Sequence, residues 1–341
     1  MTRPLAVRGT GMVTGVGLSA ASTCAAIRSA IDNFRRSGFI DGAGEMLLAS
    51  EVPLGGNHRG ASRLRRMAAE AARECLTACP QADPASTALL LCLAEKARPG
   101  TPLDEAQLLA ELQQELGVRF HLRSAAIAQG HVALATAWSH AQALLDGRGP
   151  KHVLLVATDS LLSGAAIAHY EADRRLLTSE NSDGFIPGEA AAAVLLQEAT
   201  AEPEPRLVCT GIGFGMEQAT IDSDTPLRAE GLTLAITEAL RAAGHGEGAL
   251  KFKIIDAAGA QYQFKEASLA FSRLDRTKRA EFELWHPADC IGEVGAAIGA
   301  VMVAVLYAAF TKRYACGTPV LMHLGNDSGE RAALVFAWEG C

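Results

Sequence analysis

A cysteine and a carboxylate stand three residues apart near the C-terminus, at Cys290 and Glu293. A thiolate can attack an acyl group, and a buried carboxyl with a raised pKa can act as an acid or base. Cys290 is more typical of a buried, inert thiol. For Glu293 we favour a local pair or a backbone hydrogen bond, because no nucleophile or second titratable group accompanies it in the sequence.

The other thiols and imidazoles give little support for a metal site. Cys75 and Cys79 lie one helical turn apart, which could hold a metal but is more often ordinary packing. The eight cysteines are scattered without a CxxC pair, as expected for reduced thiols in the cytoplasm. No metal-binding spacing is found for His121, His140, His152 and His169. We therefore predict neither a metal nor a cofactor.

The composition excludes several classes of partner. A net charge of −7 argues against nucleic acid, because phosphate binding needs a basic face. The N-terminus has no apolar core of signal-peptide length, and no apolar run reaches the ~18 residues that span a bilayer. We expect a cytoplasmic protein without membrane insertion. A cluster of four arginines could dock an acidic partner but is more typical of a solvated helix start: Arg59, Arg63, Arg65 and Arg66.

Short apolar strands alternate with amphipathic helices along the whole chain, the pattern of an α/β protein. Strands are predicted at 5–16, 88–93, 120–124, 152–158, 190–197, 207–214, 252–256, 319–324 and 332–338. Helices are predicted at 19–29, 62–78, 126–145, 227–243, 264–273 and 291–310. The stretch 199–206, ATAEPEPR, is typical of a linker. The sequence thus predicts two halves, 1–200 and 206–341.

Four segments resemble the β-ketoacyl synthase family. The most specific is RRLLTSENSDGFIPGEAAAAVLLQ at 174–197, where a polar loop with a turn at Asp183-Gly184 enters a buried strand. The opening VRGTGMVTGVGLSAASTCAAIRSA, the strand HVLLVATDSLL and the closing LMHLGNDSGERAALVF also resemble the family. Together they span nearly the whole chain, which is shorter than a typical active synthase. The resemblance implies a thiolase-like α/β fold, with two similar βαβαβ-type halves stacked in α-β-α-β-α layers.

The family's chemistry uses a cysteine nucleophile, two histidines and a lysine. By the resemblance, SAAIAQGH (124–131) puts the cysteine position on Ile127, and DAAGAQYQFKE (256–266) puts the first histidine position on Ala258. CIGEVGAAIGA (290–300) puts the second histidine position on Glu293 and the lysine position on Ala288. The gatekeeping phenylalanine position falls on Asp327. We interpret all five as vestigial positions, with no catalytic residue retained.

Three neighbouring residues are expected to be structural. His131 follows the former nucleophile motif and is predicted to pack in the core. Asp183 and Glu189 belong to the most specific segment and should fix the geometry of its loop and strand.

A vacant site implies a catalytically inactive, ketosynthase-like protein that binds a partner. One version is a subunit like a chain-length factor, which pairs with an active ketosynthase through the strand predicted at 120–124. Another is an adaptor or chaperone for a secreted effector, as encoded in type VI secretion clusters. A homodimeric remnant without a specific ligand is a third. The competing class is a residual acyl-thioester enzyme, a decarboxylase or hydrolase that uses Glu293.

Overall fold

The computed structural model describes residues 4–56, 58–101, 104–147, 149–199, 204–274 and 282–340. Its strands are β1 (Leu5–Thr14), β2 (Arg35–Ile40), β3 (Met46–Ala49), β4 (Thr87–Leu93), β5 (Ala125–Ala128), β6 (His152–Ser160), β7 (Glu189–Glu198), β8 (Arg206–Met216), β9 (Phe252–Ile255), β10 (Leu284–Trp285), β11 (Val320–Gly325) and β12 (Glu330–Glu339). Its α-helices are α1 (Ala20–Arg28), α2 (Gly60–Ala78), α3 (Glu105–Leu116), α4 (Ala133–Leu144), α5 (Gly164–Ala172), α6 (Glu230–Ala243), α7 (Gln261–Leu274), α8 (Ala288–Ile291) and α9 (Ile298–Thr311). Single 3₁₀ turns include η2 (Gly130–Val132) and η4 (Gly295–Ala297).

The main sheet repeats one topology twice. Its order is β10-β9-β11-β12-β8-β1-β7-β6-β4-β5, and the two central strands join through a short antiparallel pairing at Leu5–Val7. Counted outward from that junction, the halves read β1-β7-β6-β4-β5 and β8-β12-β11-β9-β10. In each half the second strand is antiparallel to both neighbours and the outer pairs are parallel. The predicted pair of similar halves is confirmed, although the sequences show no obvious repetition.

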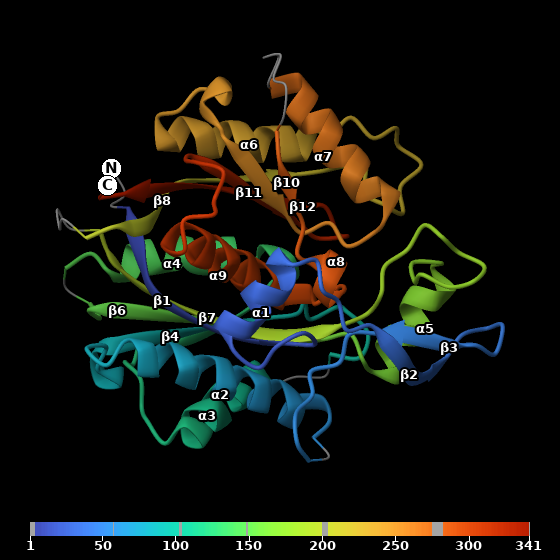
Figure 1. Ribbon diagram of the computed structural model, residues 1–341, viewed down its shortest axis with the longest axis horizontal. Coiled ribbons are helices and arrows are strands. Elements are labelled where there is room, and N and C mark those ends of the chain that lie inside the picture. The colour runs from blue at the N-terminus through green and yellow to red at the C-terminus, as the bar shows by residue number, and fades with distance from the viewer. Residues whose placement is uncertain are drawn as a thin grey trace.

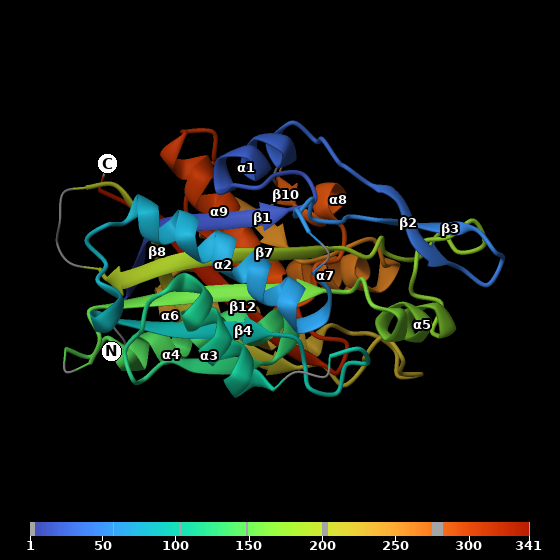
Figure 2. The ribbon, with the colours of Figure 1, turned by 90° about the horizontal axis from the view of Figure 1, so that it is seen from below.

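Five layers follow from this sheet (Figure 1). Helices α2 and α3 cover the outer face of the first half, as the turned view also shows (Figure 2), and α6 and α7 cover the outer face of the second. Helices α4 and α9 lie between the two halves of the sheet. The predicted α-β-α-β-α layering is therefore confirmed. Residues 200–203, half of the predicted linker, lie outside the described residues, so the boundary between 200 and 206 stays a prediction.

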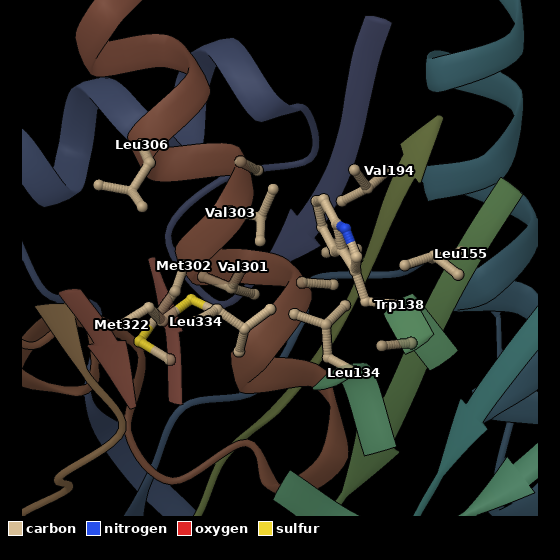
Figure 3. Packing of buried hydrophobic residues seen from close by; sticks show 14 of the residues in the cluster. Leu134, Trp138, Leu155, Val194, Val301, Met302, Val303, Leu306, Met322 and Leu334 are labelled. Atoms are coloured by element: carbon tan, nitrogen blue, oxygen red, sulfur yellow. The ribbon is translucent and has the colours of Figure 1, made fainter. Parts of the chain in front are cut away.

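The central layer forms the main core (Figure 3). Leu134 and Trp138 of α4 face Val301 and Met302 of α9, and all four side chains are buried. The Trp138 ring lies 5.4 Å from that of Phe336 on β12, edge to face. Because α9 is apolar on nearly every side, it is stable only when covered by both halves of the sheet.

Glycines let the outer helices approach the sheet closely. A Cβ atom at Gly213 of β8 would lie 2.1 Å from the Ala235 carbonyl oxygen of α6. On β1, a Cβ atom at Gly11 would lie 2.1 Å from the Ala71 carbonyl oxygen of α2. The glycine-punctuated strands at the start of both halves are thus explained by backbone contact with a helix.

Several predicted elements differ from the structure. The strand predicted at 120–124 is wrong: Ser124 closes a turn on the His121 carbonyl, and pairing with β4 runs over β5 at 125–128. The helix predicted at 126–145 begins as η2 and α4 instead. The one predicted at 291–310 is interrupted, because Gly292 and Gly295 adopt positive φ angles of 70° and 53°. The β2–β3 hairpin and α5 were not predicted. Among the described residues, no helix has the length and apolarity to cross a bilayer.

Candidate functional site

Three segments that are distant in the sequence converge where α4 and α9 begin. His131 lies in η2, Asp256 directly follows β9, and Glu293 stands between α8 and η4. The main chain at Glu293 is fixed by the loop that precedes β7. Its N–H donates to the Ile186 carbonyl at 2.8 Å, and its carbonyl accepts from Gly188 at 2.8 Å. The segment with the strongest family resemblance therefore positions the carboxylate.

The His131 ring bridges two carboxylates. Its Nδ1 lies 2.9 Å from Oδ2 of Asp256, and its Nε2 lies 3.0 Å from Oε1 of Glu293. Each carboxylate oxygen also accepts a backbone N–H, from Gly325 at 2.8 Å and from Gly295 at 2.7 Å. Both ring nitrogens can donate only when the imidazole is protonated. The arrangement is therefore suited to an imidazolium held between two anions.

The electrostatics agree with that geometry. Burial by itself lowers the pKa of His131, but attraction from Glu293 and hydrogen bonds to Asp256 and Glu293 outweigh it, so the pKa lies well above its usual value. Burial raises the pKa of Asp256, but the hydrogen bond and charge of His131 reverse this and the pKa is lowered. At neutral pH the stable form is therefore the ionised pair of the His131 imidazolium and the Asp256 carboxylate.

Further charged groups surround the bridge. Arg98 and Asp159 form a buried ion pair, with Nη1 to Oδ2 at 2.7 Å, and Asp159 also accepts from the Ala296 N–H at 2.8 Å. Burial raises the pKa of Glu95, and the charge of His131 opposes this rise. Arg175 contacts Asp327 at 3.1 and 3.2 Å. The site therefore contains several charged side chains, and Arg98 and Arg175 each pair with an aspartate.

The cavity at this network is very small. It is bounded by Glu95, Arg98, His131, Leu161, Tyr170, Arg175, Phe185, Gln263, Glu293, Gly295, Gly325, Asn326 and Asp327. Its free space is about 30 Å³, which holds roughly one water molecule. This cavity has no room for an acyl chain.

The sequence-predicted positions are only partly brought together. Glu293 and Asp327 line the small cavity. Ile127 lies in β5 with 6% of its surface exposed, and Ala288 opens α8 with 5% exposed. Ala258 is half-buried, and its N–H donates to Gln263 at 2.9 Å. That these five are vestigial catalytic positions remains a prediction.

Two expectations about the site were wrong. Glu293 does have a titratable partner, and His131 is a polar bridge rather than a packing residue. The partners lie 125 and 162 residues from His131, so spacing in the sequence could not reveal them. Asp256 was missed, although its position directly after a buried strand was a usable signal. Glu95 was missed as well.

Other expectations can be compared with the contacts. Glu189 accepts hydrogen bonds from the Val52 N–H and the Ser160 hydroxyl, each at 2.9 Å, and Asp183 accepts from the Gln261 N–H at 2.7 Å, which confirms their structural roles. The solvated helix start is wrong for Arg63, whose side chain is 12% exposed and paired with Glu189.

Three cysteines agree with the expectation of buried or packed thiols. Cys290 is 4% exposed, and burial raises its pKa to about 11. Cys75 and Cys79 are buried as well. No cluster of three metal-ligating side chains is found in the part of the chain that the structure describes.

Comparisons with known proteins show which fold this chain has. No family model matches the chain, and no curated protein matches its sequence. Solved structures do match. A ketosynthase in complex with its chain length factor from Xenorhabdus doucetiae gives a TM-score of 0.79 at 13% identity, covering 99% of this chain and 98% of that one.

Two further structures agree. A type II polyketide ketosynthase with its acyl-carrier protein gives 0.78 at 15% identity, over 99% of this chain and 100% of that one. The ketosynthase from module 6 of the bacillaene synthase of Bacillus subtilis 168 gives 0.76 at 13% identity, over 98% and 72%. The chain therefore has the thiolase-like fold of ketosynthases and chain length factors, as predicted. At these identities the likeness is one of fold alone.

Proposed function

We propose that this chain is a non-condensing, ketosynthase-like protein that acts as a partner subunit. The observation that carries the proposal is the interior of the site. The position assigned to the nucleophile holds Ile127, and the cavity of about 30 Å³ at Glu293 is lined by the charged side chains of the His131 bridge and of Arg98, Arg175 and Asp327. A hydrocarbon side chain cannot accept an acyl group, and a cavity this small has no room for an acyl substrate.

Cys290 does not replace the missing nucleophile. Its thiol is buried with a pKa of about 11, so the reactive thiolate is scarce at neutral pH. It is also absent from the lining of the His131 cavity. Ala258, Ala288 and Asp327 complete the set of positions that we propose to be vestigial.

The pairing surface that we propose is the free edge of β5. This strand ends the ten-stranded sheet, so one side of its backbone has no strand partner among the described residues. It consists of Ala125–Ala128 and carries no lysine or proline that would block edge pairing. Leu122, in the turn before it, is 90% exposed. Support also comes from the matched structures that are described as ketosynthase and chain length factor pairs.

The molecular mass in solution tests the pairing. Sedimentation should give twice the 35.7 kDa of the chain, or one chain bound to a co-expressed ketosynthase encoded nearby. Successive amides of a strand point to opposite edges, so one of Ala125→Pro and Ala126→Pro removes an outward N–H. The variant that loses the outward N–H should dissociate the dimer or complex. The other proline variant should mainly weaken the pairing of β5 with β4. A monomer in both experiments refutes the proposal.

A turnover assay tests the missing chemistry. Incubation with malonyl and acyl thioesters of a carrier protein should give neither a condensed product nor an acylated protein by mass spectrometry. Detection of either one refutes the non-condensing role.

The His131 bridge favours a second candidate, a residual acyl-thioester hydrolase or decarboxylase. For hydrolysis, Glu293 would take a proton from a water molecule as that water attacks the thioester carbonyl, and the thiol would leave. His131, 3.0 Å from Glu293, would hold the carboxylate in place. This candidate requires the cavity to open and predicts turnover that Glu293→Gln abolishes. The absence of turnover in the unmodified protein rules it out.

The adaptor and chaperone versions rest on the same absence of the family's catalytic residues from the positions assigned to them. Genes for lipid or polyketide synthesis beside this one favour a subunit, whereas secretion and toxin genes favour an adaptor. A homodimer that has neither kind of neighbouring gene and no bound partner would fit a homodimeric remnant.

A further inference from the structure

A second cavity lies between α1, α8, β10 and the end of α9. It is lined by Cys24, Ile27, Arg28, Ala30, Leu284, Trp285, His286, Pro287, Asp289, Cys290, Val305 and Tyr314. Its volume is about 310 Å³, roughly twice that of a cavity that takes benzene. It shares no lining residue with the cavity at His131. The space suits an aromatic ring with a short tail.

Its walls are aromatic and already held in place. The Trp285 ring lies 4.5 Å from that of Phe252 and 6.3 Å from that of Tyr314. The indole N–H of Trp285 donates to Glu283 at 2.8 Å, so this polar atom needs no ligand. Walls fixed before binding reduce the entropy lost when a ligand enters.

The floor is neutral. Burial raises the pKa of both Cys24 and Cys290 to about 11, so both remain protonated thiols at neutral pH. Protonated thiols behave as small apolar groups, and they favour reversible contact with a ring over covalent capture.

One cation at the rim is available to a ligand. The Arg28 guanidinium stacks over the Tyr314 ring at 4.3 Å, a geometry that leaves its in-plane N–H donors open. No ion pair joins Arg28 to a carboxylate within the described ranges. His286 and Asp289 also line the cavity, with Nδ1 of His286 2.9 Å from Oδ1 of Asp289.

The charges also fix the direction of binding. Burial, followed by the negative charges of Asp289 and Asp32, raises the pKa of Cys290, so the side of the cavity at Cys290 is unfavourable to an anion. An anionic ligand therefore turns its charge toward Arg28 and its ring toward Trp285 and Val305.

We propose that this cavity is a reversible binding site for small aromatic carboxylates, with the ring between Trp285 and Val305 and the carboxylate on Arg28.

The test uses 3-(4-fluorophenyl)propionate as the probe and the corresponding propanol as its uncharged match. Titration should broaden the ¹⁹F line of the carboxylate saturably. It should also shift the indole ¹⁵N–¹H signal of Trp285, assigned through Trp285→Phe, and leave that of the buried Trp138 in place. Arg28→Gln should weaken the carboxylate by roughly tenfold or more and leave the propanol unchanged, because only the charged hydrogen bond is lost.

Arg241→Gln is the matched control because this substitution removes the same charge. Arg241 lies on α6, and 74% of its side chain is exposed. The substitution should not alter binding. Ile27→Phe, which fills the cavity, should weaken both probes. The proposal is overturned if the Trp285 signal does not move, or if Arg28→Gln and Arg241→Gln bind the carboxylate equally.

Discussion

Replacement of His131 by alanine should be strongly destabilising. The change leaves Asp256 and Glu293, which are 8% and 7% exposed, without the cation between them. Two buried carboxylates then face each other across the space of the ring. Removing one member of a buried charge pair costs more than the pair contributes, because the remaining charge is uncompensated.

The size of the effect can be worked from the contacts. His131 makes two charged hydrogen bonds, at 2.9 and 3.0 Å, and such bonds are each worth about 1.5–3 kcal/mol. Broken buried pairs cost about 3–5 kcal/mol. The N–H groups of Gly325 and Gly295 still stabilise the carboxylates in the variant. We therefore expect a loss of about 3–4 kcal/mol in the free energy of unfolding.

The difference should depend on pH in a defined direction. The folded pKa of His131 is raised, so its contribution is complete below its unfolded pKa of about 6.5 and falls as pH rises toward the folded value. The loss reaches at most about 1.4 kcal/mol per pH unit. The lowered pKa of Asp256 has the opposite sign: its contribution is present above its unfolded pKa and is lost as pH falls through the folded pKa.

Urea unfolding of both proteins between about pH 5.5 and pH 8.5 measures this difference in the free energy of unfolding. The gap should be widest near pH 6 and should narrow at higher pH. His140→Ala, at an exposed position of helix α4, which follows η2, is the control and should change stability by less than about 0.5 kcal/mol. A gap below about 1 kcal/mol, or one that does not vary with pH, would refute the charged bridge.

Three further outcomes are expected. Arg63→Met should lower the free energy of unfolding by about 3–5 kcal/mol, measured in urea, because it leaves Glu189 buried without its cation. Arg66→Met on the same helix, where the side chain is 42% exposed, should lower it by less than about 1 kcal/mol, and equal losses would contradict the prediction. Gly213→Ala should lower stability by about 1–3 kcal/mol because a Cβ atom would meet the α6 backbone at 2.1 Å, and Gly246→Ala, with open space around it, should be neutral, so similar melting temperatures would contradict the close packing. Ile127→Cys should not be acylated by an acyl thioester, since position 127 lies in β5 with 6% of its surface exposed and the thiol would be buried; an acyl adduct in the mass spectrum would show that this part of the protein opens.

The local pattern of the chain, together with the family resemblance, was enough for the architecture. Periodicity in the apolar residues gave most strands and helices, and the family resemblance gave the layered, two-half arrangement. Errors occurred where local signals conflict. In 120–128 the apolar residues do not show where pairing begins, and the turn at Ser124 moves the strand to Ala125. Positive φ angles at Gly292 and Gly295 divide a segment whose composition predicts one continuous helix.

The sequence by itself determined which side chains are available: an isoleucine at the position assigned to a nucleophile, alanines at Ala258 and Ala288, and a carboxylate at Glu293. Only the tertiary structure decided what that carboxylate does. His131 reaches Glu293 and Asp256 across 162 and 125 residues because η2, the end of β9 and the loop before α9 meet at one place. Contacts over such separations depend on the order of strands in the sheet, and the spacing of residues along the chain does not contain that order.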